Sequence, residues 1–420
     1  MSKYSSLRGM PDILPEEAAK FEWIESRARE VFGMFEFREI RVPYLESTEV
    51  FTRSIGENTD IVEKEMYTFL DRGGKQISLR PEGTASIVRA YVEHNLSNKA
   101  DIVKLFYIGP MFRGERPQKG RQRQFHQIGC EIIGASSPYL DADLIMSLKT
   151  FFEKLGIKDF TLNINTLGCA EDRKKFASDL SEYFAGHLNG LCENCQRRST
   201  RNVLRVLDCK NPACKEIVKG APGVAKNLCP DCLDNYSLLK HILHDAGVTY
   251  NEKTDLVRGL DYYTGTVFEV SHPSLGAQDA LAAGGRYDNL VHEMGGPDVG
   301  ATGYAVGMER LLLVIKEENY PAVKPGILII ALDEKSHKEA FKLTNKLREA
   351  GIKCDMDHSG RSLKGGMRKA DKEKREKVII IGENELASGM VVVKNMVTGE
   401  QKSVGFGETV DLLIGENAHG

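Results

Sequence analysis

The stretch GPMFRGERPQKGRQRQFHQIGCE, residues 109–131, is the part of the sequence that decides the expected fold. One strand-like run, VKLFYIG at 103–109, leads into it, and a second, FHQIGCEIIG at 125–134, closes it. Between them, residues 113–123 carry five Arg or Lys and one acidic residue, Glu115. The pattern predicts a strand hairpin whose basic loop attracts phosphate.

The second strand of this hairpin has a polar and an apolar face. A period of two places Gln127, Gly129 and Glu131 on one face and the intervening Ile128, Cys130 and Ile132 on the other. The apolar face predicts contact with the core. The polar face is either solvated or the floor of a polar pocket, and the basic loop beside it favours the pocket.

Elsewhere, helices and strands alternate without a regular βαβ period. Apolar residues after Pro15 and in 85–96 recur every three or four positions, which predicts two amphipathic helices, and TVFEVS at 266–271 reads as a strand. This mixture favours an α+β fold with an antiparallel sheet. Residues 169–253 read as a helical insertion. After a linker at 316–325, a βαβαβ pattern predicts a small parallel sheet.

Composition narrows the class of protein. The chain has 420 residues, of which 41% are hydrophobic and 28% charged, and its net charge is −3. These values indicate two to four folded domains and exclude disorder, collagen and a wholly basic nucleic-acid binder. No apolar run approaches the roughly 18 residues of a membrane span, and the first residues show no signal-peptide pattern. We therefore expect no membrane association and a cytoplasmic location.

Three shorter motifs are each weak evidence for a functional site when taken alone. LRPEGT at 79–84 precedes a helix, and its Thr84 reads as a possible N-cap. LVRGLDYYTGTVFEV at 256–270 places Arg258 and two tyrosines before a strand, and GYAVGMER at 303–310 leads into an apolar helix. The sequence contains no P-loop motif and no protein-kinase motif set.

Taken together, these motifs resemble the class II aminoacyl-tRNA synthetases, and among them the histidyl-tRNA synthetase family, over essentially the whole chain. Motif 1 corresponds to the first helix and the strand reaching Pro43. Motif 2 corresponds to Phe112, Arg113 and Glu115 with Arg121 and Phe125, and motif 3 to Gly303, Gly307, Glu309 and Arg310. Alanine at 305 departs from the general motif 3 pattern. LVRGLDYYTG at 256–265 and AAGGRYDNL at 282–290 resemble the stretches typical of histidyl enzymes.

The resemblance implies the domain organisation. It implies an α+β class II catalytic domain with an antiparallel sheet over residues 1–168 and 254–322, an insertion domain at 169–253, and a C-terminal α/β anticodon-binding domain at 323–420. Residues 335–377 hold 14 Lys and Arg against 7 Asp and Glu, which fits contact with tRNA phosphates but also suits a solvated helix surface. A homodimer formed through motif 1 is also implied.

The resemblance further implies ligation of L-histidine to its tRNA through a histidyl-adenylate, with ATP and Mg²⁺. Arg113 and Arg258 would hold the histidine carboxylate and the α-phosphate as catalytic residues. The implied ATP-binding residues are Arg113, Glu115, Arg121, Phe125 and Arg310, with Phe125 stacked on adenine, Glu115 on its amino group, and Arg310 at the adenine face or the distal phosphates. The implied histidine pocket comprises Glu82, Gly83, Thr84, Arg113, Gln127, Glu131, Arg258, Tyr262 and Tyr263. Arg116 and Gln118 would reach the acceptor end of the tRNA.

A cysteine cluster stands apart from these motifs. Six of the nine cysteines lie between Cys192 and Cys232. Two C-x₂-C pairs predict a structural Zn²⁺ on Cys192, Cys195, Cys229 and Cys232, distant from the catalytic sheet, although their separation exceeds the usual zinc-ribbon spacing. Cys209 and Cys214 leave the choice of four ligands open, and reduced cysteines in a helical insertion are the alternative.

Three other functions fit parts of the sequence. A catalytically idle synthetase-like regulatory subunit of ATP phosphoribosyltransferase is the nearest, but such paralogues generally lack the anticodon domain and parts of the catalytic set. A class II synthetase for threonine, proline or glycine is opposed by the LVRGLDYY stretch. A nucleic-acid-binding zinc protein would leave residues 109–131 and 303–310 unexplained.

Overall fold

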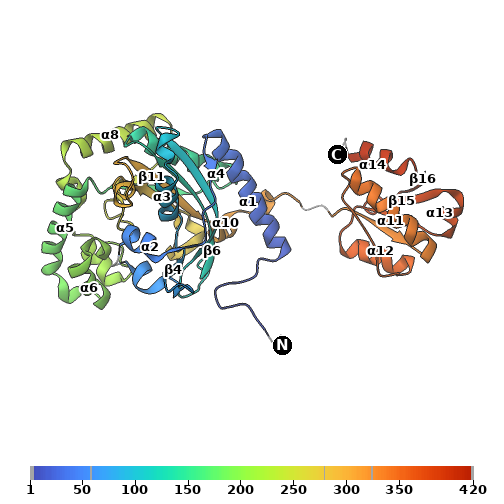
Figure 1. Ribbon diagram of the computed structural model, residues 1–420, viewed down its shortest axis with the longest axis horizontal. Helices are drawn as coiled ribbons and strands as arrows, with labels where there is room; N and C mark the ends of the chain where they lie inside the picture. Colours follow the sequence, from blue (N-terminus) through green and yellow to red (C-terminus); the bar gives the residue numbers. More distant parts are fainter. Residues whose placement is uncertain (1–3, 57–58, 279, 323–324, 418–420) are drawn as a thin grey trace. The chain divides into compact units, whose positions relative to one another are not determined.

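The computed structural model describes residues 4–56, 59–278, 280–322 and 325–417, and the chain divides into two compact units, Met1–Tyr320 and Pro321–Gly420 (Figure 1). The predicted domain boundary at 322–323 and part of the predicted linker fall on residues 323–324, which lie outside the described residues.

A largely antiparallel sheet organises the first unit. Its strands, in the order β1-β5-β6-β11-β10-β9-β7-β8, pair antiparallel except at the two edges, where β1 pairs parallel with β5 and β8 with β7. The predicted antiparallel sheet is confirmed. The strands are β1 Arg38–Glu39, β5 Val103–Phe112, β6 Gln124–Ile133, β7 Thr161–Thr166, β8 Asn251–Glu252, β9 Thr264–Ser271, β10 Ala280–Arg286 and β11 Ala301–Gly307.

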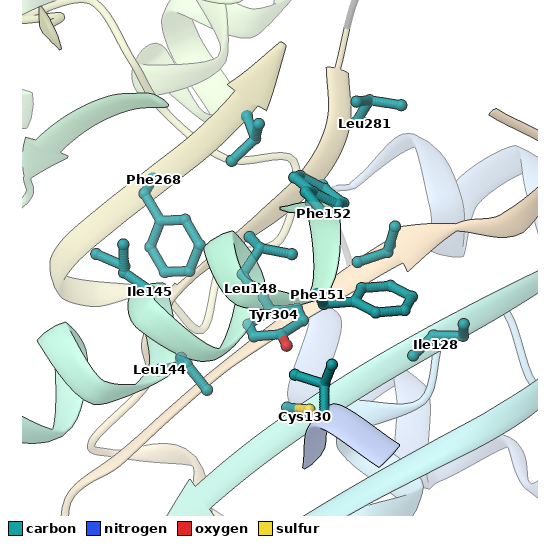
Figure 2. Packing of buried hydrophobic residues seen from close by; sticks show 14 of the residues in the cluster. Ile128, Cys130, Leu144, Ile145, Leu148, Phe151, Phe152, Phe268, Leu281 and Tyr304 are labelled. Carbon is teal, nitrogen blue, oxygen red and sulfur yellow. The ribbon is translucent and has the colours of Figure 1, made fainter. Parts of the chain in front are cut away.

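Helices cover one face of this sheet and form its main core. They are α1 Pro15–Met34, α4 Pro138–Lys154, α8 Pro230–Asp245 and α10 Met308–Val314. The Phe32 ring of α1 lies 5.3 Å from the Phe151 ring of α4 and 5.4 Å from the Phe106 ring of β5. Figure 2 shows α4 side chains gathered with Ile128 and Cys130, so the predicted apolar face of β6 is confirmed as core.

The opposite face carries α3 Thr84–Glu93 and a small antiparallel sheet. That sheet has the order β2-β4-β3, with β2 Leu45–Ser47, β3 Thr68–Leu70 and β4 Gln76–Leu79, and α2 Thr48–Ile55 and α9 Leu290–Glu293 lie near α3. Helix α3 ends at Glu93 rather than at the predicted residue 96. Asn95 takes the left-handed conformation, with φ of 48°, which interrupts the helix before the short turn Leu96–Asn98.

The cysteine-rich segment is helical, as predicted. It contains α5 Ala170–Ala185, α6 Glu193–Arg201, α7 Pro212–Val218 and α8, separated by short 3₁₀ turns, and Figure 1 shows α5 and α6 at the outer edge of the first unit. Its apolar residues, including Phe176 and Leu204, join the same buried cluster as Tyr107 of β5 and Val267 of β9. The segment therefore packs as part of the first unit.

The second unit has a mixed sheet in the order β13-β12-β14-β15-β16. Strands β12 Ile327–Ala331, β13 Cys354–Met356 and β14 Lys377–Ile381 are parallel and are linked through α11 Glu334–Glu349 and α12 Leu363–Lys372, as predicted. The predicted small parallel sheet is confirmed for these three strands, but the prediction missed β15 Met390–Asn395 and β16 Gln401–Gly405, which pair antiparallel. Strand β15 lies between β14 and β16, and β16, with mostly polar residues, is the edge strand. Helices α13 Glu383–Ser388 and α14 Thr409–Asn417 complete the unit.

None of the helices within the described ranges is long and apolar enough to cross a membrane.

Candidate functional site

A cavity of about 1140 Å³ lies against the α3 face of the large sheet and is bordered by the cysteine-rich segment. Most of the residues that the sequence singled out line it. They are Glu82, Thr84, Arg113, Glu115, Arg121, Phe125, Gln127, Arg258, Tyr262, Tyr263 and Arg310.

Three arginines converge on one end of this cavity. The Nε of Arg113 donates to the carbonyl of Pro81 (2.9 Å), Arg121 pairs with Glu115 (2.9 Å), and the Nε of Arg310 donates to the carbonyl of Gly120 (3.3 Å). Burial, and then the neighbouring charges of Arg121 and Arg113, lower the pKa of Arg310. Such a concentration of positive charge suits a polyanion such as a triphosphate.

An aromatic ring lies beside these cations. The guanidinium of Arg113 sits over the Phe125 ring, 5.2 Å from its centroid, and Phe125 projects from the second strand of the basic hairpin. A flat aromatic ring and a planar cation together form a surface on which a planar heterocycle can stack.

Arg258 approaches the cavity from the loop before β9. It forms an ion pair with Glu269 of β9 at 2.7 Å. Its Nε atom is buried and has no hydrogen-bond partner among the described residues, and the same is true of Oε1 of Gln127. A buried polar atom without a partner is costly, so both atoms point to a polar ligand in the cavity.

Behind the cavity wall, Glu131 forms a buried hydrogen-bond network. Its side chain is fully buried and accepts hydrogen bonds from the hydroxyls of Thr84 (2.7 Å) and Tyr287 (2.5 Å). Burial raises the pKa of Glu131 to about 8. A Cβ atom at Gly303 would lie 1.6 Å from Oε2 of Glu131, so the first glycine of GYAVGMER makes room for this carboxylate.

Thr84, a candidate N-cap from the sequence, is the first residue of α3 and not its N-cap. Gly83 is the N-cap of α3, and Glu82 accepts hydrogen bonds from the backbone N–H groups of Thr84 (2.6 Å) and Ala85 (2.9 Å). The Thr84 hydroxyl is thereby left to bond Glu131. A Cβ at Gly83 would lie 2.2 Å from the ring of Tyr107, so glycine here allows that ring to approach.

The two tyrosines of LVRGLDYY form one wall of the cavity. The rings of Tyr262 and Tyr263 are 4.7 Å apart, and Tyr262 also meets Tyr287 edge-on at 5.6 Å. Both are buried, and burial raises the pKa of Tyr263 to about 12, so its hydroxyl stays protonated near neutral pH.

The loop of the hairpin has one side toward the cavity, with Glu115, Gly120 and Arg121, and another side in solvent. Arg116 and Gln118 are exposed and do not line the cavity. Backbone bonds between Gln118 and Arg121 (3.0 and 2.9 Å) close a tight turn at the loop tip, and the carbonyl of Gly9 holds the base by accepting from Arg123 (2.7 Å). The loop is therefore anchored at its base and open to solvent at its tip.

Comparison with known proteins decides the family. A family model described as histidyl-tRNA synthetase matches residues 9–311, and one described as anticodon binding domain matches residues 326–416. The chain belongs to the histidyl-tRNA synthetase family. It is 47% identical to the histidine–tRNA ligase of Geobacter sulfurreducens, over 95% of this chain and 97% of that one, and 48% identical to that of Thermodesulfovibrio yellowstonii, over 98% of each.

Solved structures agree with this assignment. The apo histidyl-tRNA synthetase of S. aureus superimposes with a TM-score of 0.82 at 35% identity, over 97% of this chain and 99% of that one. The antiparallel sheet and the C-terminal unit described above are thus those of a class II histidyl-tRNA synthetase.

In this member of the histidyl-tRNA synthetase family, the predicted zinc ligand set is wrong. The two C-x₂-C pairs lie in different clusters: Cys192 and Cys195 gather with Cys209 and Cys214, whereas Cys229 and Cys232 gather with Cys169 and Asp172. The pairs start two different helices, α6 and α8, and these N-termini lie in separate parts of the segment. Sequence spacing alone does not reveal this separation.

The cysteine-rich segment of the synthetase is also not distant from the catalytic sheet, contrary to expectation. Arg198, Arg205, Asp208 and Cys209 line the same cavity as Arg113 and Arg258. Arg198 and Arg205 both pair with Asp60, at 2.7 and 3.4 Å, and fasten the segment to the catalytic part of the unit.

Sequence reasoning missed three residues of the synthetase site: Glu269, Tyr287 and Tyr107. Tyr287 lies inside the AAGGRYDNL stretch and Glu269 inside the LVRGLDYYTGTVFEV stretch, so both had a local signal. The sequence predicted Tyr107 only as a residue of an apolar strand. Its ring occupies the space beside Gly83 and Gly129, where a Cβ would lie 2.2 and 2.3 Å from the ring.

Proposed function

We propose that this chain activates L-histidine with ATP and transfers it to its tRNA, as a histidine–tRNA ligase. The observation that carries the proposal is that one cavity combines the arginine cluster with a pocket backed by Glu131. The first part suits a nucleoside triphosphate and the second a small polar amino acid. Full-length relatives named histidine–tRNA ligase at 47–48% identity support the same function.

The first step joins the two substrates within the cavity. The α-carboxylate of histidine is ionised near neutral pH, so it attacks the α-phosphate of ATP without a general base and releases pyrophosphate. In our proposal Arg113 and Arg258 hold the carboxylate and the α-phosphate and stabilise the charge that develops there. The terminal ribose of the tRNA then attacks the acyl carbon of the adenylate and displaces AMP.

ATP occupies the end where the arginines converge. Phe125 stacks on adenine, Glu115 accepts from its amino group, and Arg121 and Arg310 lie toward the phosphates. The 5.2 Å contact between Arg113 and the Phe125 ring supports this placement, because stacking and phosphate binding then occur side by side.

Histidine occupies the pocket made by the two tyrosines and the polar face of β6. In our proposal it is surrounded by Glu82, Gly83, Thr84, Gln127, Glu131, Tyr262 and Tyr263. Glu82 lines the cavity, whereas Glu131 lies behind Thr84 and Tyr287. In our proposal a carboxylate of this pocket accepts a hydrogen bond from the substrate's N–H group. An amino acid without that donor leaves a buried carboxylate unpaired, which gives strong discrimination.

Mg²⁺ accompanies ATP in this family. The carboxylates of Glu65 and Glu269 line the cavity and are oxygen ligands of the kind that Mg²⁺ prefers, so the donor set fits and these residues would hold the ion. When bound, the ion would offset phosphate charge during adenylate formation.

A structural Zn²⁺ in the cysteine-rich segment is a further part of the proposal. We assign it to Cys192, Cys195, Cys209 and Cys214, whose sulfur atoms all lie within 4.8 Å of one another. Cys195 and Cys214 are fully buried, which suits a closed structural site rather than a catalytic one.

The tRNA contacts two parts of the chain in our proposal. The exposed Arg116 and Gln118 meet the acceptor end, and the C-terminal unit, which matches an anticodon-binding domain, meets the anticodon stem. We retain the division into a catalytic domain at 1–168 and 254–322, an insertion at 169–253 and a C-terminal domain at 323–420.

We also propose a cytoplasmic homodimer that forms through motif 1. Next to the Pro43 end of motif 1 lies a patch of large apolar residues that are 43 to 67% exposed: Tyr44 before β2, Leu45 in β2, and Phe69 and Leu70 in β3. A second copy of the chain, related by a two-fold axis, would cover this patch.

Exchange of pyrophosphate into ATP with each amino acid in turn tests the function. We expect exchange with histidine alone. Exchange with threonine, proline or glycine would reassign the specificity, and no exchange with any amino acid would favour the regulatory-subunit alternative, which the ligase relatives disfavour.

A further inference from the structure

Three helices of the cysteine-rich segment begin in the same way. Each has a cysteine at its N-cap and a potential metal ligand three residues later: Cys169 and Asp172 at α5, Cys192 and Cys195 at α6, and Cys229 and Cys232 at α8. The α5 pair escapes a search for C-x₂-C because its second member is an aspartate. Local geometry is therefore the same at all three helix starts.

Tertiary structure sorts these pairs into two groups of four. Cys192 and Cys195 join Cys209 and Cys214, while Cys229 and Cys232 join Cys169 and Asp172, and in each group the ligand atoms all lie within 4.8 Å of one another. Sulfurs bound tetrahedrally at about 2.3 Å from Zn²⁺ lie about 3.8 Å apart. The Sγ atoms of Cys192 and Cys209 are 3.9 Å apart, so this pair of the first group already has that spacing.

We propose that the segment holds two structural Zn²⁺ ions, the second one on Cys169, Asp172, Cys229 and Cys232. This extends the single zinc of the proposed function to a second site, and it does not depend on the ligase activity. Three thiolates and one carboxylate form a closed set of four ligands of types that Zn²⁺ accepts.

The surroundings of Asp172 support the second site. Its side chain is fully buried, and its oxygens accept hydrogen bonds from the backbone N–H groups of Cys229 (3.0 Å) and Cys169 (3.4 Å). Those bonds fix the carboxylate next to the three sulfurs. A carboxylate that backbone N–H groups hold next to three sulfur atoms is oriented as a metal ligand requires.

The ligands of the first site lie, along the chain, between the two pairs of ligands of the second site, and the two sites connect different helices. The second site joins the start of α5 to the start of α8, 60 residues later, and so closes the base of the segment. The first site lies within that loop and holds α6 and α7 together. Its Cys192 and Cys209 line the catalytic cavity, whereas none of the second site's ligands does.

Metal content of the full-length chain tests the proposal. Protein purified without added zinc or chelator should contain about two equivalents of zinc per chain by mass spectrometry. Cys195→Ser and Cys232→Ser should each remove about one equivalent, and the double variant both. The matched control is Cys354→Ser, which changes a buried cysteine in the second unit and should retain two.

Two measurements on the unmodified chain test the proposal even if the cysteine variants fail to fold. A mercurial reagent should release about two equivalents of zinc as it titrates the thiols, and growth with Co²⁺ should yield the absorption of tetrahedral cobalt–thiolate centres. One equivalent, lost in Cys195→Ser and kept in Cys232→Ser, would overturn the second site.

Disulfide formation is the other contrary result. Absence of zinc together with an intact mass two units lower per cysteine pair would overturn both sites. Failure of histidine-dependent exchange in a chain that carries two zinc ions would contradict the ligase function and leave the metal proposal standing, so the two failures are distinguishable.

Discussion

Glu131 is a fully buried carboxyl group that carries a prediction about stability. Burial raises its pKa to about 8, from an ordinary value near 4.5. A carboxyl group whose pKa is raised in the folded state stabilises that state below its unfolded pKa. This contribution is lost as the pH rises through the folded pKa. The window of loss therefore runs from about pH 4.5 to 8.

We predict that the first unit loses stability across this window and that Glu131→Gln removes much of the slope. The free energy of unfolding should fall by up to about 1.4 kcal/mol per pH unit in the wild type. Urea unfolding at pH 5 to 9, monitored by the fluorescence of the single tryptophan, Trp23, measures this free energy. The control is Glu17→Gln, an exposed position on α1. Equal slopes in wild type and Glu131→Gln would refute the prediction.

Arg258 carries the second prediction at this scale. Arg258→Ala should lower histidine-dependent pyrophosphate exchange by about a hundredfold or more, because it removes charge that stabilises the transition state. The far-ultraviolet circular dichroism should stay unchanged. Arg53→Ala, at a 74% exposed side chain on α2, should leave exchange unaffected. Exchange close to wild type in Arg258→Ala would remove this residue from the mechanism.

At the scale of elements, the β5–β6 hairpin separates two tasks. Its strands carry Phe125 and Gln127 into the cavity, and its loop tip holds Arg116 and Gln118 in solvent. The alternation along β6 was readable from the sequence because a strand has a period of two and one face must be buried. The contacts that hold the loop come from residues far away in sequence, with Gly9 at its base and Arg310 at Gly120, and strand periodicity does not predict them.

This separation predicts unequal losses in the two half-reactions. Replacing Arg116 and Gln118 together by alanine should lower transfer of histidine to tRNA about tenfold or more, because a phosphate contact is lost. Pyrophosphate exchange should change less than about twofold, since neither side chain lines the cavity. Arg72→Ala, an exposed arginine in another turn, is the control. Equal losses in both assays would mean that the loop serves ATP alone.

For the whole molecule, we predict a dimer at micromolar concentration. Leu45→Asp should shift sedimentation velocity toward the monomer, because it places a charge in an apolar patch that a second copy covers. The matched control is Leu188→Asp in the cysteine-rich segment, since Leu188 is 40% exposed and Leu45 43%. A wild-type chain that sediments as an active monomer would contradict the homodimer.

The sequence by itself determined the class of fold, the family and eleven of the residues that line the cavity. Hydrophobic periodicity located α1 and β6, and short motifs located the arginines and the two tyrosines, because these features are local or follow a fixed period. Only the tertiary structure decided which cysteines gather and how close the cysteine-rich segment lies to the cavity. It also revealed Tyr287 beside Glu131. These outcomes depend on where helix starts and strand ends meet in space, and spacing along the chain does not specify that.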